Sequence, residues 1–166
     1  MPIPILSDSE RRPIFPEGWV GSLSHSGSFV FGGLSSSNRF SRIGIDIEKT
    51  RFNKISFDLA RVPRVLHLTE LEWFKANAKN SFFCQHSHSF SMFLTCVASM
   101  KEALYKSLSI SEQMKSSWKS WRMTSFESTG LTLNAKFMRE SDSVEREVYS
   151  EYFSQEKGFF ISVSAY

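Results

Sequence analysis

The sequence has few cysteines and no long apolar run, and each absence excludes a class of protein. Its two cysteines, Cys84 and Cys96, lack the spacing of a metal site, so a reduced cytoplasmic setting is expected. No apolar run approaches the roughly 20 residues of a membrane-spanning helix. The N-terminus lacks the basic start of a signal peptide. We therefore expect a cytoplasmic protein without a membrane span.

Motifs of several common enzyme classes are also missing. There is no glycine-rich phosphate loop of the Rossmann or P-loop kind and no nucleophile elbow. The net charge of +3 is too small to argue for nucleic acid, although it suits anionic ligands or acidic partner proteins. With 166 residues, 41% hydrophobic and 22% charged, the composition is that of a globular protein with one domain or two small lobes.

The most informative stretch that is present is 42–48 (RIGIDIE). Isoleucine occupies every second position, which predicts a strand with one buried face. Asp46 and Glu48 then leave the sheet on the same side, about 7 Å apart along the strand. Two carboxylates that close repel unless both are solvated, one is protonated or a cation lies between them. A solvated outer face is the ordinary alternative, whereas a cation held by oxygen ligands alone would be Mg²⁺ before Zn²⁺.

The remaining pattern predicts strands, then helices, then strands. Two strands at 19–24 and 28–34 are expected to form a meander with 42–48. Thr69 and Glu72 have the spacing of a capping box that opens a helix. Four more strands are expected after the helices, at 118–126, 130–137, 148–153 and 159–165. This order predicts an α+β fold with a mostly antiparallel sheet.

The longest expected helix covers about 90–108. Lys101 falls inside its apolar stripe, so either its stem packs while the ammonium reaches out, or it faces a buried anionic ligand. Glu102 and Lys106 lie together on a different face, one turn apart. An ordinary exposed ion pair is the alternative interpretation of those two.

Three stretches occur in a consistent order and are specific only in combination: 21–26 (GSLSHS), 44–50 (GIDIEKT) and 99–106 (SMKEALYK). Together they resemble the 4′-phosphopantetheinyl transferases of the surfactin and enterobactin-synthase type. The segment 11–18 (RRPIFPEG) resembles the R-x-P-x-W-P-x-G segment of the enterobactin branch, with Phe15 where tryptophan is usual. The resemblance implies an α+β fold with mostly antiparallel sheets, a long helix and two pseudo-symmetric lobes.

The activity implied by the resemblance is a Mg²⁺-dependent transfer. The 4′-phosphopantetheine arm of coenzyme A moves to a serine of an acyl or peptidyl carrier protein, and 3′,5′-ADP is released. The family's metal-binding acidic residues correspond to Asp46, Glu48 and Glu102, and the candidate catalytic residues are Glu102, Lys106 and Glu48. The base that activates the serine is either Glu102 or a metal-bound water oriented by Glu48. The enterobactin branch suggests siderophore peptide synthesis.

The resemblance also implies the contacts to coenzyme A. The lysine that contacts its phosphate corresponds to Lys106, and the preceding lysine to Lys101. The Ser-His phosphate contact corresponds to Ser24 and His25, and a basic residue near the nucleotide corresponds to Arg11. Lysine ammonium groups can stabilise charge that builds on phosphoryl oxygens.

The front of the chain departs from the family pattern. The enterobactin branch usually has several dozen residues before the segment that here starts at Arg11. We therefore expect a partial N-terminal lobe over 1–41 and a C-terminal lobe with the metal site and the long helix over 42–166. An exposed apolar edge near 19–34 would follow, with self-association through it, weak coenzyme A binding, or both.

Two other functions stay open at this stage. One is a catalytically weak homologue that binds coenzyme A or carrier proteins without turnover. The other is a Mg²⁺-dependent hydrolase of pyrophosphate bonds that uses the same carboxylates.

Overall fold

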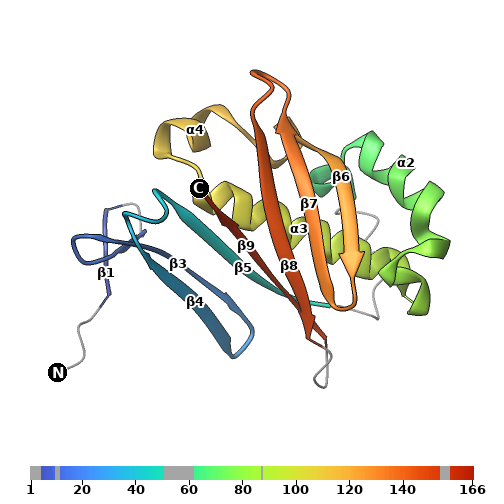
Figure 1. Cartoon of the computed structure of the whole chain (residues 1–166), viewed down its shortest axis with the longest axis horizontal. Coiled ribbons are helices and arrows are strands. Elements are labelled where there is room, and N and C mark those ends of the chain that lie inside the picture. Colours follow the sequence, from blue (N-terminus) through green and yellow to red (C-terminus); the bar gives the residue numbers. More distant parts are fainter. Residues whose placement is uncertain (1–4, 10–11, 51–61, 87, 154–157) are drawn as a thin grey trace.

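The computed structural model describes residues 5–9, 12–50, 62–86, 88–153 and 158–166 (Figure 1). Its strands are β1 (Leu6–Ser7), β2 (Pro13–Ile14), β3 (Trp19–Ser26), β4 (Phe29–Ser36), β5 (Ile43–Lys49), β6 (Trp121–Thr129), β7 (Thr132–Arg139), β8 (Glu145–Phe153) and β9 (Phe159–Ala165). Its helices are α2 (Leu68–Asn77), α3 (Ser89–Ser107) and α4 (Ile110–Lys115), with 3₁₀ turns η1 (Ala78–Asn80), η2 (Phe82–Gln85) and η3 (Trp118–Ser120).

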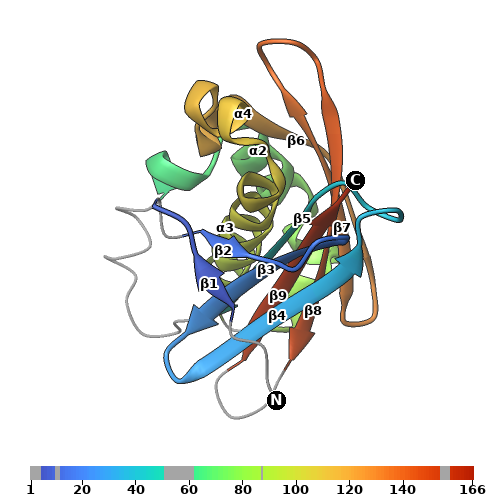
Figure 2. The same ribbon diagram turned by 90° about the vertical axis from the view of Figure 1, so that its left-hand side faces the viewer.

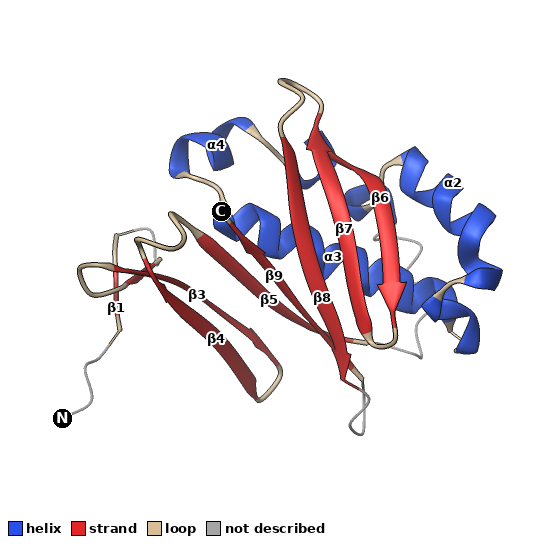
Figure 3. Cartoon of the chain, viewed as in Figure 1, coloured by secondary structure: helices blue, strands red, loops and turns tan. Residues whose placement is uncertain are grey.

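One antiparallel sheet and one long helix form the body of the molecule. The five-stranded sheet has the order β5-β9-β8-β7-β6, and α3 lies across one of its faces (Figures 1 and 3). Strand β8 alternates exposed and buried residues, as expected of a strand that is covered on one face. The predicted α+β fold with mostly antiparallel sheets is confirmed.

Helix α3 forms where the sequence predicts it, but it is buried on more than one stripe. Its residues from Ser91 to Lys101 are all buried, because the sheet covers one side while α2 and η2 pack against the other. Aromatic rings fill that second layer: Phe93 stacks on Trp73 at 5.7 Å between ring centroids and meets Phe83 edge-on at 5.4 Å.

The hairpin of β3 and β4 is a separate two-stranded sheet beside β5 (Figure 2). The predicted meander is wrong, because β5 forms its backbone ladder with β9, and β3 lies along its other edge. Side chains make this second junction. Ser22 Oγ accepts from Ile45 N at 3.0 Å, and Ser26 Oγ accepts from Lys49 N at 3.3 Å. With Ser24 between them, these residues form a serine ladder that places the hairpin against the sheet.

One helix begins at another residue than predicted and one was not predicted, and a side-chain capping box opens each of them. Helix α2 begins after His67, whose side chain accepts from Thr69 N at 3.3 Å, while Glu70 accepts from His67 N at 2.7 Å. The capping box is thus His67–Glu70 and not Thr69–Glu72. Helix α4 was not expected at all, and a Ser109–Glu112 capping box opens it.

Among the helices that the structure describes, none is long and apolar enough to cross a membrane.

Candidate functional site

Strand β5 and helix α3 approach each other closely at Gly44. A Cβ on this residue would lie 1.9 Å from the Ala103 carbonyl oxygen and 2.5 Å from Ser107 N, so a larger residue cannot stand there. Two residues further along the same face, Asp46 is only 3% exposed. The interpretation of this face as a solvated one is therefore wrong for Asp46, because α3 packs against it.

Asp46 is held by donors from two other elements. Ser24 Oγ of β3 donates to Asp46 Oδ1 at 2.8 Å. Lys106 Nζ of α3 donates to the same oxygen at 2.9 Å and to Ser24 Oγ at 3.0 Å. Three segments far apart in the sequence thus meet at one carboxylate oxygen.

Glu102 and Glu48 complete an acidic cluster, which we define as Asp46, Glu48 and Glu102. Glu102 Oε1 lies 4.0 Å from Lys106 Nζ. Burial raises the pKa of Glu102 above its ordinary value; Lys106 opposes this increase, whereas the charges of Asp46 and Glu48 add to it. Asp46 and Glu102 thus share one ammonium, that of Lys106.

The cluster suits a hard divalent cation. Asp46 Oδ2 is buried and has no hydrogen-bond partner among the described residues, and a buried polar oxygen without a partner needs compensation. All donors are carboxylate oxygens, the ligands that Mg²⁺ prefers, and this ion usually keeps several waters and substrate phosphate oxygens. Within the described ranges, no three His, Cys, Asp or Glu side chains are already arranged to hold a metal. The residue types of the cluster thus fit such a cation, while the described side chains do not by themselves enclose one.

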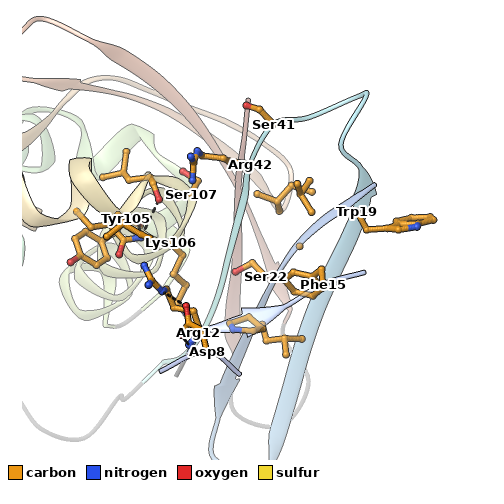
Figure 4. Close-up of a pocket in the computed structure, with 18 of the residues that line it drawn as sticks. Asp8, Arg12, Phe15, Trp19, Ser22, Ser41, Arg42, Tyr105, Lys106 and Ser107 are labelled. Atoms are coloured by element: carbon orange, nitrogen blue, oxygen red, sulfur yellow. Dashed lines mark hydrogen bonds and ion pairs between the residues drawn. The ribbon is translucent and has the colours of Figure 1, made fainter. Parts of the chain in front are cut away.

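A pocket of about 560 Å³ opens beside the cluster (Figure 4). The C-terminal half of α3 lines one side with Glu102, Tyr105 and Lys106. The other side is lined by the front segment, which we define as the described residues from Asp8 to Phe15, by β3 and by the start of β5. Its basic residues are Arg12, Arg42 and Lys106. This volume is in the range of pockets that bind cofactor-sized ligands, and its basic lining suits phosphate groups.

The structure does not bring Lys101 to this site. Lys101 is 2% exposed, and its ammonium lies 2.7 Å from Glu70 Oε1 and donates to the Val65 carbonyl at 2.9 Å. Glu70 also accepts from Met123 N at 3.0 Å. The buried anion that faces this lysine is thus a side chain of α2, Glu70, and not a bound ligand.

Of the two remaining candidate residues, His25 and Arg11, only His25 belongs to the described part of the chain. His25 lies on β3, where its exposed side chain alternates with that of Ser24, and no hydrogen bond or ion pair links it to another described residue. Arg11 lies outside the described residues. Its neighbour Arg12 lines the pocket and donates from Nε to Asp8 Oδ2 at 3.0 Å.

Arg42 is a pocket residue that the sequence interpretation treated only as the start of a strand. Its backbone is fixed by reciprocal hydrogen bonds with Tyr166, at 2.9 and 3.1 Å. No carboxylate of the described residues forms an ion pair with its guanidinium, which distinguishes it from Arg12 and Lys106. The available signal was its position directly before the acidic strand.

Comparisons with known proteins identify the family of this chain. A family model described as the 4′-phosphopantetheinyl transferase superfamily matches residues 42–163, a range that holds the acidic cluster and Lys106. "Enterobactin synthase component D" of Salmonella typhimurium is 28% identical over 163 residues, which cover 98% of this chain and 62% of that protein. The proteins of the same name from Salmonella typhi and Salmonella austin are 28% and 26% identical. The chain spans about 62% of the length of these relatives.

Proposed function

The chain belongs to the 4′-phosphopantetheinyl transferase superfamily, and from this premise we propose that it transfers the 4′-phosphopantetheine group of coenzyme A to a serine of an acyl or peptidyl carrier protein, with release of 3′,5′-ADP. The observation that carries the proposal is the meeting of Ser24 and Lys106 at the buried Asp46 of the acidic cluster, beside a basic pocket.

In the proposed reaction, the carrier serine oxygen attacks the phosphorus that bears the pantetheine arm. The bond from that phosphorus to the bridging oxygen breaks, and 3′,5′-ADP leaves with that oxygen. Mg²⁺, when bound by Asp46, Glu48 and Glu102, neutralises charge on the pyrophosphate. Lys106 stabilises the charge that builds on the phosphoryl oxygens. The base that accepts the serine proton is proposed to be either Glu102 or a metal-bound water oriented by Glu48.

The basic pocket is proposed to hold the nucleotide end of coenzyme A. Arg12 and Arg42 line it together with Lys106, and an arginine fork suits the planar geometry of a phosphate. His25 and Arg11 keep the roles that the family resemblance implies for them. We further propose that 1–41 belong to an N-terminal lobe and 42–166 to a C-terminal lobe, and that the protein is cytoplasmic and acts in siderophore peptide synthesis.

The test is incubation with coenzyme A, Mg²⁺ and an apo carrier protein, read by intact mass. A mass gain of one phosphopantetheine on the carrier is expected, and it should vanish without Mg²⁺. The variant that tests the metal site is Asp46→Asn, which keeps the side-chain shape and should lower the rate by on the order of a hundredfold or more. Binding of coenzyme A without carrier labelling would instead indicate a binding homologue, and cleavage of coenzyme A without labelling would indicate a hydrolase.

A further inference from the structure

The Lys106 ammonium contacts one of the two Asp46 carboxylate oxygens, Oδ1. It is 2.9 Å from Asp46 Oδ1, 3.0 Å from Ser24 Oγ and 4.0 Å from Glu102 Oε1. Lys106 is therefore the cation that compensates Asp46 in this structure, and it reaches this position from a different element, α3.

A divalent cation and this ammonium cannot both contact Asp46 Oδ1 without strong repulsion. Mg²⁺ binds oxygen ligands at about 2.0–2.1 Å, so a cation on either Asp46 oxygen would lie within a few ångströms of the ammonium, where like charges repel strongly. Asp46 is nearly buried, so solvent screens little of that repulsion. Tight cation binding to either Asp46 oxygen, including Oδ2, which has no hydrogen-bond partner among the described residues, therefore favours a displaced ammonium.

The neighbouring pocket offers a destination for the ammonium. Lys106 also lines that pocket, and its side chain is a flexible four-carbon stem with a compact charge. A phosphate in the pocket would give the ammonium an anionic acceptor in exchange for Asp46. Binding of the phosphate then exposes Asp46 to the cation, and by linkage the cation promotes phosphate binding equally.

We propose that Lys106 acts as a built-in competitor of the divalent cation, so that the acidic cluster takes the cation tightly only when a phosphate ligand draws Lys106 away. This role is additional to a contact between Lys106 and substrate. It rests on the proposed function for the identity of the phosphate ligand, the pyrophosphate of coenzyme A, but competition at Asp46 does not depend on that identity.

The experiment measures Mn²⁺ binding to the purified protein by electron paramagnetic resonance, first without coenzyme A. Lys106→Met should bind Mn²⁺ about tenfold more tightly than the parent or better, because the competitor is gone. Lys106→Arg keeps the charge and should stay close to the parent. Lys49→Met removes a positive charge from the same strand as Asp46 without removing a contact to it, and should also stay close to the parent.

The second arm repeats the titrations with saturating coenzyme A, corrected for Mn²⁺ binding to coenzyme A alone. The parent should bind Mn²⁺ more tightly with coenzyme A than without it. In Lys106→Met this increase should be smaller, by the same factor by which the substitution tightens Mn²⁺ binding in the absence of coenzyme A. Unchanged or weaker Mn²⁺ binding by a folded Lys106→Met, or no detectable binding by any variant, overturns the proposal. Lys106→Gln serves if Lys106→Met does not fold, as judged by circular dichroism. Failure of carrier labelling by the parent would refute the transferase function while the first arm still decides the competition.

Discussion

At the scale of single residues, Lys101 illustrates how a charged residue in an apolar stripe is accommodated. Its ammonium and the Glu70 carboxylate are 1% and 0% exposed, and Glu70 also caps α2 and accepts from β6. The pair thus joins two helices and a strand at one point. A buried pair of this kind orders the core more than it adds to stability, but removing one partner leaves an uncompensated charge.

We therefore predict that Lys101→Met lowers the free energy of unfolding by about 3–5 kcal/mol and leaves coenzyme A affinity of the folded protein unchanged. Urea denaturation and calorimetric titration with coenzyme A measure the two effects. The double variant Lys101→Met/Glu70→Gln is the matched control and should recover part of the loss, because the amide keeps a hydrogen-bonding oxygen without a charge. A stable Lys101→Met that no longer binds coenzyme A would instead support the substrate contact that the family resemblance implies.

Arg42 gives a second prediction at this scale. If its guanidinium binds the 3′-phosphate of coenzyme A, Arg42→Ala should weaken coenzyme A binding by about tenfold or more. Dephospho-coenzyme A lacks that phosphate, so its affinity should hardly change. Arg39→Ala is the matched control, since Arg39 lies over the Phe40 ring and does not line the pocket. Equal losses for both ligands would place Arg42 elsewhere on the nucleotide.

At the scale of elements, α4 is a helix of six residues held at its start by side-chain bonds. Glu112 accepts from Ser109 N at 2.9 Å and lies 3.7 Å from Arg139, which in turn binds Asp142. Hydrogen bonding to Ser109 is the main cause that lowers the pKa of Glu112. The hydrogen bond from Arg139 is the main cause that lowers the pKa of Asp142.

A carboxylate whose pKa is lower in the folded state than in the unfolded state stabilises the fold above its unfolded pKa. That contribution is lost as the pH falls through the folded value. We predict that the protein loses stability from about pH 4.3 downward, and that Glu112→Gln is less stable at pH 7 but declines less steeply in acid. Thermal unfolding across pH 3–7 measures this, with the exposed Glu127→Gln as control. Parallel pH profiles of Glu112→Gln and the parent would refute the linkage.

The elements that sequence patterns predict well are those whose signal is local and repeated. The alternation of isoleucines located β5, and the apolar spacing located α3. The strand pairing was wrong because the ladder partner of β5, β9, lies more than 100 residues along the chain, as the Thr50–Gly158 bond at its end illustrates. The six-residue α4 is too short for periodicity to detect.

The site shows the same division between local and distant information. Asp46 and Lys106 belong to contiguous motifs, and both were foreseen as site residues. The partner of Lys101 was not, since Glu70 lies 31 positions away on another helix. Pocket residues such as Arg42 and Arg12 come together only through packing of the front segment beside α3.

At the scale of the whole molecule, the hairpin presents apolar side chains to solvent. Val30 is 75% exposed, and the other large apolar side chains that the hairpin exposes are Trp19, Leu23, Phe29, Phe31 and Leu34. Strand β4 is paired only with β3 among the described strands, so its second edge is open. A surface of this kind tends to bury itself against another molecule.

We predict that the chain self-associates through this hairpin, so that its weight-average mass in sedimentation velocity rises with protein concentration. Val30→Lys should shift the equilibrium toward the monomer, because a charge would be buried in the contact. Leu131→Lys, on an exposed turn far from the hairpin in the sheet, is the control and should behave like the parent. A monodisperse monomer at every concentration would contradict the prediction.

The serine ladder has a consequence for motion. The hairpin joins β5 through side-chain hydrogen bonds, whereas the strands of the main sheet are joined by backbone ladders. Native-state hydrogen exchange should therefore find the amides of β3 and β4 in a sub-global unit that opens at lower free energy than the sheet. Because Ser24 belongs both to this unit and to the acidic cluster, each opening dismantles the site. Coenzyme A with Mg²⁺ should slow exchange in β3 and β4 while leaving β6 to β8 unchanged, which makes the hairpin's opening rate a reporter of ligand occupancy.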